Sequence, residues 1–323
     1  AWNASQAVQN IVKEKDTTIL KIGASLGASS SRAESSSSGS QVVGSSLESL
    51  GNLSLRATGD GAAGSGDIAV TGSSLSGTNV SLIAADAIIL KSAQSTSEHE
   101  SSSKSSGGSI GVSANIGTEQ AGLTLDLAAN MARGNSDGSS LTHTETVVKA
   151  TEQLTLQSGG DTTLQGAQAR GEQVTAVVGG NLTLTSEQDQ ETLSSKNKSM
   201  GIGISVPILG AGSVSVSGNY AADKVSLDYQ SVNEQTGLYA GAGGFDVQVG
   251  GHTALTGAVI ASAADAANNR FTTESLSHSN LGNRLDWEAE ASGLSLSYSA
   301  APGSGPTDKP ELRPGMPVQF DDG

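Results

Sequence analysis

The feature that most constrains this chain is that its sequence repeats on two scales. On the shorter scale, residues 160–166, Gly-Asp-Thr-Thr-Leu-Gln-Gly, recur 20 positions later at 180–186 as Gly-Asn-Leu-Thr-Leu-Thr-Ser. On the longer scale, residues 67–94 align with residues 161–188 at a constant offset of 94, and a third copy follows at 250–257. A fixed short period indicates an architecture in which each unit stacks on the next.

Each short copy alternates apolar and polar residues, as in Leu-Thr-Leu at 154–156 and again at 182–184. Period two predicts short strands with one buried face. Glycine paired with Asp or Asn separates the strands and predicts corners, where glycine supplies positive φ. The predicted corner residues are Gly66, Asp67, Gly160, Asp161, Gly180, Asn181, Gly250 and Gly251. We therefore expect an all-β fold, a parallel β-helix (β-solenoid) with coils of about 20 residues, interrupted by β-hairpins in repeats of about 92 residues.

The interrupting hairpins are predicted from strands in which every second residue is apolar, the others being mostly Gly, Ser or Ala. The first strands begin at Leu20, Ile110 and Met200, with residues 285–291 as a fourth, and partner strands follow most of them, including 294–298. The candidate hairpin residues are Ile110, Val112, Ile116, Leu123, Leu125, Leu127, Met200, Ile202, Ile204, Val206, Ile208, Val214 and Val216. Ser-rich stretches at 29–40, 95–106 and 187–199 are expected to be exposed, mobile connectors.

These patterns divide the chain into three repeat units with flanking segments. The predicted segments are an irregular cap at 1–19, repeat units at 20–109, 110–201 and 202–284, a partial unit at 285–301, and a tail at 302–323. The tail holds five of the six prolines, which cannot donate to a strand ladder, so it is expected to be an extended linker.

Composition excludes several classes of function. The net charge of −15 repels a polyphosphate, so nucleic acid is not expected as a partner. With no cysteine there is no disulfide, thiolate nucleophile or Cys-ligated zinc. The sequence contains no run of 18 or more apolar residues, so no membrane helix is predicted. The N-terminal residues Ala-Trp-Asn predict a piece of a longer chain.

Motifs that resemble catalytic or cofactor sites fall in the wrong structural context. Residues 23–27 and 107–111 match the nucleophile-elbow pattern, but both lie in predicted hairpin strands rather than before a helix. Residues 59–64 match a dinucleotide-binding glycine spacing, yet another strand follows. The four histidines show no metal-ligand spacing. We assign no catalytic, cofactor-binding or metal-binding residue.

Four ordered phrases, at 158–167, 178–184, 229–241 and 244–251, resemble the haemagglutinin-repeat region of filamentous-haemagglutinin-like exoproteins, including effectors of contact-dependent growth inhibition. The resemblance covers roughly residues 20–300. It implies a right-handed β-helical filament on the bacterial cell surface, exported by an outer-membrane two-partner-secretion transporter. It also implies contact with a target-cell surface or outer membrane, and an immunity protein only if a toxin domain follows.

Three functions are compared. The first is a non-enzymatic filament segment that mediates cell-cell interaction. The second is a membrane-engaging element that helps a C-terminal toxin cross the target-cell outer membrane, since nine alternating residues at 200–208 approach the length of a membrane-spanning strand. Against this stands packing of the same hairpins on the solenoid flank, which the sequence favours. The third, a glycan-active enzyme, is disfavoured because aromatic residues are only 3%.

Overall fold

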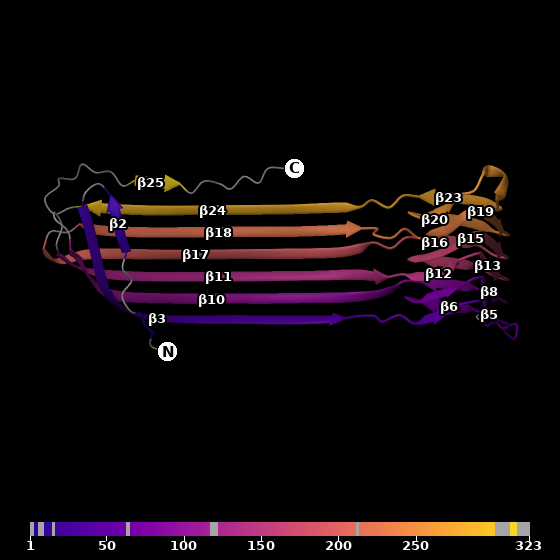
Figure 1. Cartoon of the computed structure of the whole chain (residues 1–323), viewed down its shortest axis with the longest axis horizontal. Helices are drawn as coiled ribbons and strands as arrows, with labels where there is room; N and C mark the ends of the chain where they lie inside the picture. The colour runs from indigo at the N-terminus through magenta and orange to yellow at the C-terminus, as the bar shows by residue number, and fades with distance from the viewer. Residues whose placement is uncertain are drawn as a thin grey trace.

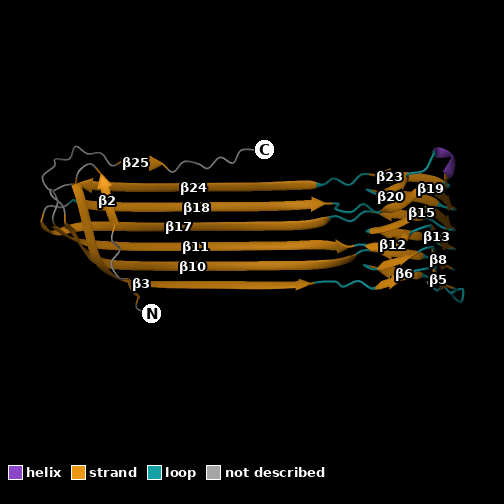
Figure 2. Ribbon diagram, viewed as in Figure 1, coloured by secondary structure: helices purple, strands orange, loops and turns teal. Residues whose placement is uncertain are grey.

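The computed structural model describes residues 3–5, 10–14, 17–62, 65–116, 122–210, 213–300 and 311–314. Two parts are joined end to end: a short stack of coils and a long, single-layered sheet that extends away from it (Figures 1 and 2). Helical structure within the described ranges is confined to a three-residue 3-10 helix, Ala266–Asn268, and no helix there is long and apolar enough to cross a bilayer.

The stack of coils is a parallel β-solenoid, as predicted. Its first strands are β4 (Ser46–Glu48), β5 (Leu53–Ala57), β6 (Ile68–Thr71), β7 (Ser74–Gly77), β8 (Val80–Ala84), β9 (Ile88–Lys91), β12 (Thr146–Ala150) and β13 (Gln153–Ser158). The remaining strands are β14 (Thr162–Gln165), β15 (Ala167–Val178), β16 (Leu182–Thr185), β19 (Gly237–Val249), β20 (His252–Thr256), β21 (Val259–Ser262), β22 (Asn269–Thr272) and β23 (Ser275–Ser279). All pair in parallel, in one sheet of ten strands and one of six.

The hydrophobic core lies inside this solenoid. Alternation sends every second side chain inward, and Leu82, Leu154, Leu164 and Leu184 are fully buried. Every buried member of the core cluster belongs to a solenoid coil or its corner. Apolar burial therefore stabilises the coils and contributes little to the long sheet.

The long sheet consists of six extended strands, all antiparallel. They are β3 (Thr17–Ser40), β10 (Ala93–Ile116), β11 (Gly122–Thr144), β17 (Asp189–Gly210), β18 (Val214–Ser231) and β24 (Arg284–Ala300), adjacent in that order. Three short strands, β1 (Asn3–Ser5), β2 (Asn10–Glu14) and β25 (Glu311–Pro314), pair at the two edges. A strand of 24 residues spans about 80 Å, whereas strands usually have 3–10 residues.

The two parts fit together because they grow by the same step. Two solenoid coils separate β3 from β10, two more separate β11 from β17, and two more separate β18 from β24. Strands lie about 4.8 Å apart in any sheet, so two coils and the two strands of one hairpin both advance about 9.6 Å. Hairpins of successive repeats can therefore pair with one another without strain.

The register gives the offsets between stacked residues. Where the chain passes directly from one coil to the next, stacked residues are 20 apart for Asp67 with Ala87 and for Asp161 with Asn181, and up to 28 apart elsewhere in the stack. Where a hairpin intervenes, stacked residues are 74 apart at Asn79 with Gln153, or 71 apart at Asn181 with His252. The long repeat is thus one direct step followed by one step that includes a hairpin.

The corner residues do lie at corners, but positive φ explains only one of their glycines. Gly66 has φ 87°, whereas Gly160, Gly180, Gly250 and Gly251 are outside the left-handed region. At those four positions a Cβ would collide with the residue stacked in the preceding coil. Glycine is required there by close approach between coils.

The acidic and amide residues beside these glycines link one coil to the next. Asp161 Oδ1 accepts a 2.7 Å hydrogen bond from the backbone N–H of Asn181, and Asn181 Oδ1 accepts one of 2.9 Å from His252. Asp67 does the same with Ala87 at 2.9 Å. The corners thus satisfy backbone donors of the next coil, which is a structural role for these side chains.

The expectation that residues 29–40, 95–106 and 187–199 are mobile connectors is wrong. They lie almost wholly within β3, β10 and β17, and pairing on both sides of β10 and β17 occupies their backbone groups. Their side chains are mostly exposed. Serine-rich sequence is compatible with such a strand because the ladder, not side-chain packing, holds it.

The hairpin expected between 285–291 and 294–298 is a single continuous strand, β24. Leu285 and Trp287 point to one face, and Leu294 and Leu296 to the other, because the alternation changes phase between them. That change of phase resembles a turn in the sequence but occurs inside a straight strand.

The end segments also depart from expectation. The irregular cap at 1–19 contains β1, β2 and the start of β3, while its remaining residues lie outside the described ranges. In the tail at 302–323, residues 311–314 pair with β24 at the sheet edge, where a strand tolerates proline. The rest of the tail is outside the described residues.

We predict that Gly179→Ala destabilises the solenoid, because its Cβ would overlap the carbonyl oxygen of Gly159 in the coil below. Overpacking of this kind costs about 1–3 kcal/mol of the free energy of unfolding. Gly51→Ala is the matched control, since nothing lies within 4 Å of its Cβ position. Urea unfolding followed by circular dichroism measures both. Equal midpoints for the two variants would contradict the close stacking of coils.

Candidate functional site

The end of the long sheet farthest from the solenoid carries a continuous apolar surface on one face. Residues directly opposite in neighbouring strands lie on the same face of a sheet. One row crosses all six long strands in this way: Leu26, Ile110, Leu127, Ile204, Val216 and Tyr298. Hydrophobic residues from three repeat units and the partial unit, distant in sequence, therefore form a single line.

Adjacent rows on the same face extend this line into a patch, here called the apolar band. It runs from the row of Ile22, Ala114 and Leu123 to the row of Met131, Met200, Tyr220 and Leu294. These rows span nine residues of β10, or about 27 Å. The side chains are accessible: Ile110 is 52% exposed and Ile202 is also 52% exposed.

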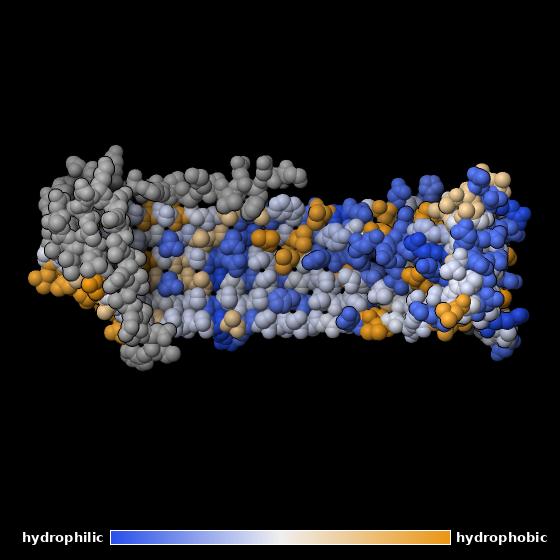
Figure 3. Space-filling view, in the orientation of Figure 1, coloured by the Kyte–Doolittle hydropathy of each residue, from blue (hydrophilic) through white to orange (hydrophobic). Residues whose placement is uncertain are grey.

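The opposite face of the same strands is polar and small. One row there consists of Ser25, Gly111, Asp126, Ser205, Ser215 and Ser299. Asp126 accepts a 2.6 Å hydrogen bond from Ser113 and another from Ser205. One face of the molecule, seen in Figure 3, is mostly hydrophilic or neutral along the sheet. The end of the long sheet is thus amphipathic.

The structure brings nearly all the predicted hairpin residues onto this band. Ile110, Val112, Leu123, Leu125, Leu127, Met200, Ile202, Ile204, Val206, Val214 and Val216 lie on it. Ile208 lies at a bulge, where two residues of β17 oppose one of β11. Ile116 is in β10, but its side chain is outside the described set.

Packing of these hairpins on the solenoid flank is therefore wrong. The band lies at the far end of the long strands, separated from the coils by their serine-rich halves (Figure 1). Each hairpin pairs along its length with strands of the neighbouring repeats. The hairpins therefore extend away from the coils and do not fold back onto the flank of the solenoid.

Sequence reasoning missed how rows from different repeats complete each other. Met131, Met200, Ile202, Tyr220 and Leu294 line a shallow apolar hollow of about 550 Å³ on the band. Met131 and Tyr220 had no obvious role in a hairpin considered alone. Only the register between β11, β17 and β18 places them together.

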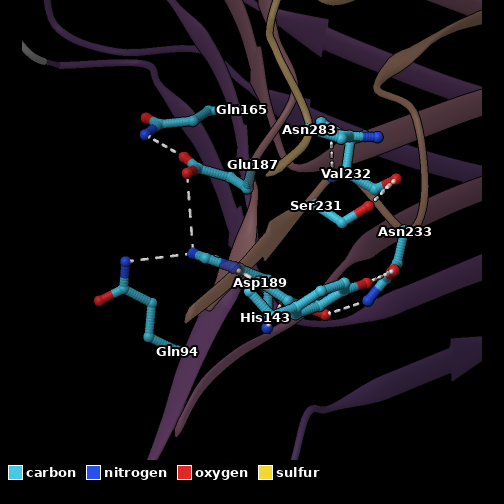
Figure 4. A network of polar contacts seen from close by, with 10 residues as sticks. Gln94, His143, Gln165, Glu187, Asp189, Ser231, Val232, Asn233 and Asn283 are labelled. Atoms are coloured by element: carbon cyan, nitrogen blue, oxygen red, sulfur yellow. Dashed lines mark hydrogen bonds and ion pairs between the residues drawn. The ribbon is translucent and has the colours of Figure 1, made fainter. Parts of the chain in front are cut away.

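A polar network fastens the base of the long sheet to the solenoid (Figure 4). His143, whose side chain is 6% exposed, lies 3.0 Å from Asp189 and 3.6 Å from Glu187 through its two ring nitrogens. Asp189 also accepts a 2.6 Å bond from Asn233, and Glu187 accepts one from Gln165. Three of these pairs are far apart in sequence: Gln94 and His143 by 49 residues, His143 and Asp189 by 46, and Asp189 and Asn233 by 44. Sequence spacing therefore did not reveal the network.

Beside this network, Glu145 is the single residue between β11 and β12, where the chain leaves the long sheet and enters the solenoid. Its Oε2 atom is buried without a hydrogen-bond partner. Burial, followed by the neighbouring Glu234 carboxylate, raises the pKa of Glu145 to about 8. The nearby Arg170 opposes this only partly; it bonds Gln168 and stacks on Tyr239 at 4.3 Å.

Within the described ranges, no group of three or more His, Asp or Glu side chains is arranged to hold a metal ion. The histidines 99, 143, 252 and 278 are distributed over different strands. His252 bonds Ser275 and Ser277, each at 2.7 Å. His252 thus links the neighbouring solenoid strands β20 and β23.

The fold and the band define a class of protein: a β-solenoid whose repeated hairpins pair into one projecting sheet. A family model described as "Hemagglutinin repeat" matches residues 26–200. The chain belongs to this haemagglutinin-repeat family, whose members are secreted, surface-exposed proteins.

Three curated relatives illustrate the similarity. The chain is 41% identical over 86% of its length to "Toxin CdiA" of Escherichia coli and covers 9% of that protein. It is 41% identical over 88% of its length to "Deoxyribonuclease CdiA" of Dickeya dadantii, covering 8% of it. It is 42% identical over 89% of its length to "Deoxyribonuclease CdiA" of Yersinia pseudotuberculosis and covers 26% of that protein. The chain thus spans a small part of these relatives. No solved structure matches it.

We predict that Glu145→Gln stabilises the protein increasingly as pH rises. The folded-state pKa of about 8 exceeds the ordinary value of 4.5, so protonation of Glu145 favours folding below pH 4.5. That contribution is lost as pH rises through 8, whereas glutamine stays neutral. Urea midpoints measured from pH 4 to pH 9 test this. The exposed Glu152→Gln is the control, and a difference between variant and wild type that does not change with pH would contradict the assignment.

Proposed function

We propose that this chain is a non-enzymatic segment of a surface filament whose long sheet engages the outer membrane of a target cell. The observation that carries the proposal is the apolar band, which is exposed on one face of paired strands and backed by a polar face. The solenoid supplies the rigid, repeating support. Mediation of cell-cell contact follows from a filament that carries such a surface outward.

The dimensions of the band support contact with lipid. Strands β3, β10 and β11 each contribute nine residues to it, whereas β18 and β24 contribute seven each, and a membrane-spanning strand needs about 9–11. The height of about 27 Å matches the apolar zone of about 25 Å on strands that cross membranes. Alternation of apolar residues on one face with Ser, Gly and Thr on the other is the arrangement such strands adopt.

The exposure of the band also favours an apolar partner. Large residues from all six strands, including Leu26 at 56% and Met131 at 54% exposed, lie on one contiguous surface. Contiguous exposed apolar patches of this kind mark interaction sites. Lipid chains can cover the apolar band over its whole width, and no protein partner of complementary shape is needed.

The edges of the sheet are consistent with a longer filament. A strand in lipid must have its backbone groups paired. The interior strands are paired on both sides, and we propose that hairpins of adjoining repeats pair with the stretches of β3 and β24 that β1, β2 and β25 do not cover. The two-coil step of the solenoid sets the spacing for such continuation.

The relatives named as toxins and nucleases support a delivery role for the complete protein. On this proposal the segment helps a C-terminal toxin cross the target-cell outer membrane. An outer-membrane two-partner-secretion transporter would export the protein, and an immunity protein would be a partner only where a toxin domain follows. A glycan-active enzyme is not proposed, because aromatic side chains, which stack on sugars, make up only 3% of the chain.

We predict that Ile204→Lys weakens binding to phosphatidylcholine vesicles. Ile204 lies in the central row of the band, and a cation at the centre of a lipid-facing strand costs about 2–4 kcal/mol, equivalent to at least about a 30-fold loss of partitioning. Ser217→Lys, on the opposite face of the adjacent strand, is the matched control. Flotation of the purified chain measures partitioning, and circular dichroism confirms that both variants fold. Equal flotation of wild type and both variants would overturn membrane engagement through the band.

A further inference from the structure

A row of basic side chains crosses the long sheet immediately below the apolar band. Arg32 lies opposite Lys104, Lys104 lies opposite Arg133, and Arg133 lies opposite Lys198. The four side chains come from four adjacent strands, share one face and are exposed. They are called the basic row. Lys104 and Lys198 occupy the same position in successive repeats, at the offset of 94 that relates the coils.

This arrangement is costly for a free protein. Like charges directly opposite each other in a sheet destabilise it. The chain has 17 Lys and Arg residues and 32 Asp and Glu residues, so there are more than enough acidic side chains to pair with every basic one. Of the four cations in the row, Arg32 has a salt bridge, to Glu34, whereas Lys104, Arg133 and Lys198 have none among the described residues. Three of the four side chains therefore present uncompensated positive charge.

Its position relative to the band identifies a suitable anion. The basic row lies two residues below the last apolar row, the one that contains Met131, Met200 and Tyr220, and on the same face. Two residues of a strand span about 7 Å. A cation at that distance from hydrocarbon lies at the depth of lipid headgroups, and long Lys and Arg side chains reach that layer readily. Tyr220 in the last row is typical of residues at such an interface.

We propose that the basic row binds the phosphate groups of anionic lipid headgroups and so sets how deeply the band enters the membrane. This rests on the proposed membrane function. Four cations spaced by about 5 Å match a surface densely covered with phosphate better than they match one isolated anion. The guanidinium groups of Arg32 and Arg133 bind phosphate in a bidentate manner, and the lysines add point charges.

The experiment is flotation of the purified chain with two kinds of vesicle, phosphatidylcholine alone and phosphatidylcholine mixed with phosphatidylglycerol. The test variant combines Lys104→Gln, Arg133→Gln and Lys198→Gln. The matched control combines Arg56→Gln, Lys91→Gln and Lys149→Gln, three exposed cations of solenoid strands. Both variants lose the same net charge, so a difference between them reports position.

Wild type and control are expected to bind the anionic vesicles more tightly than the neutral ones. The test variant is expected to lose most of that preference. Each basic residue near an anionic surface contributes about a fivefold effect, so the loss is about 100-fold for three residues. The preference should also decline with added salt. Binding of the test variant to neutral vesicles should change little.

Other outcomes separate the two proposals. If wild type floats equally with both vesicles, or if test and control variants lose the same preference, the basic row is overturned while membrane engagement stands. If wild type floats with neither vesicle, the proposed function fails, and this inference fails with it. Inorganic phosphate added at constant ionic strength should leave flotation unchanged. Release from the anionic vesicles by phosphate would instead assign the row to a soluble anion and overturn the proposal.

Discussion

The rest of this structure depends on the constant spacing of about 4.8 Å between hydrogen-bonded strands. Parallel coils stack at this spacing in the solenoid, and antiparallel strands pair at the same spacing in the long sheet. Two coils and one hairpin therefore rise by equal amounts. Each repeat can insert a hairpin of forty or more strand residues without disturbing the coils, and each hairpin pairs in register with its neighbour.

The solenoid and the long sheet are stabilised by different interactions. The solenoid buries Leu, Ile and Val in a continuous core, and its corners add hydrogen bonds from Asp67, Asp161 and Asn181 to the next coil. The long sheet has no comparable core, and backbone pairing holds it. Because packing does not dictate its side chains, both faces are free to carry different chemistry at different heights. The apolar band, the basic row and the serine-rich half use that freedom.

The junction between the two parts carries the most unusual electrostatics. His143 contacts Gln94 and Asp189 of the long sheet and Glu187 in the link between β16 and β17. Glu145 carries a buried carboxylate oxygen next to Glu234 at the point where the chain changes from antiparallel to parallel pairing. A buried, poorly compensated acid at such a point links the stability of the junction to pH.

The sequence by itself determined the solenoid, because its core positions and corners recur at fixed offsets and alternation requires only local contacts. It also identified the apolar strands of the hairpins. It did not reveal that residues 95–106 and 187–199 form strands, since serine has no strong preference and the pairing partners lie in other repeats. Nor did it reveal that the apolar residues of β24 change from one face of the strand to the other without an intervening turn. Only the tertiary structure decided the rows. Register between strands from different repeats places Ile110 beside Leu26, and Lys104 beside Arg133, because backbone pairing rather than sequence proximity sets which side chains meet.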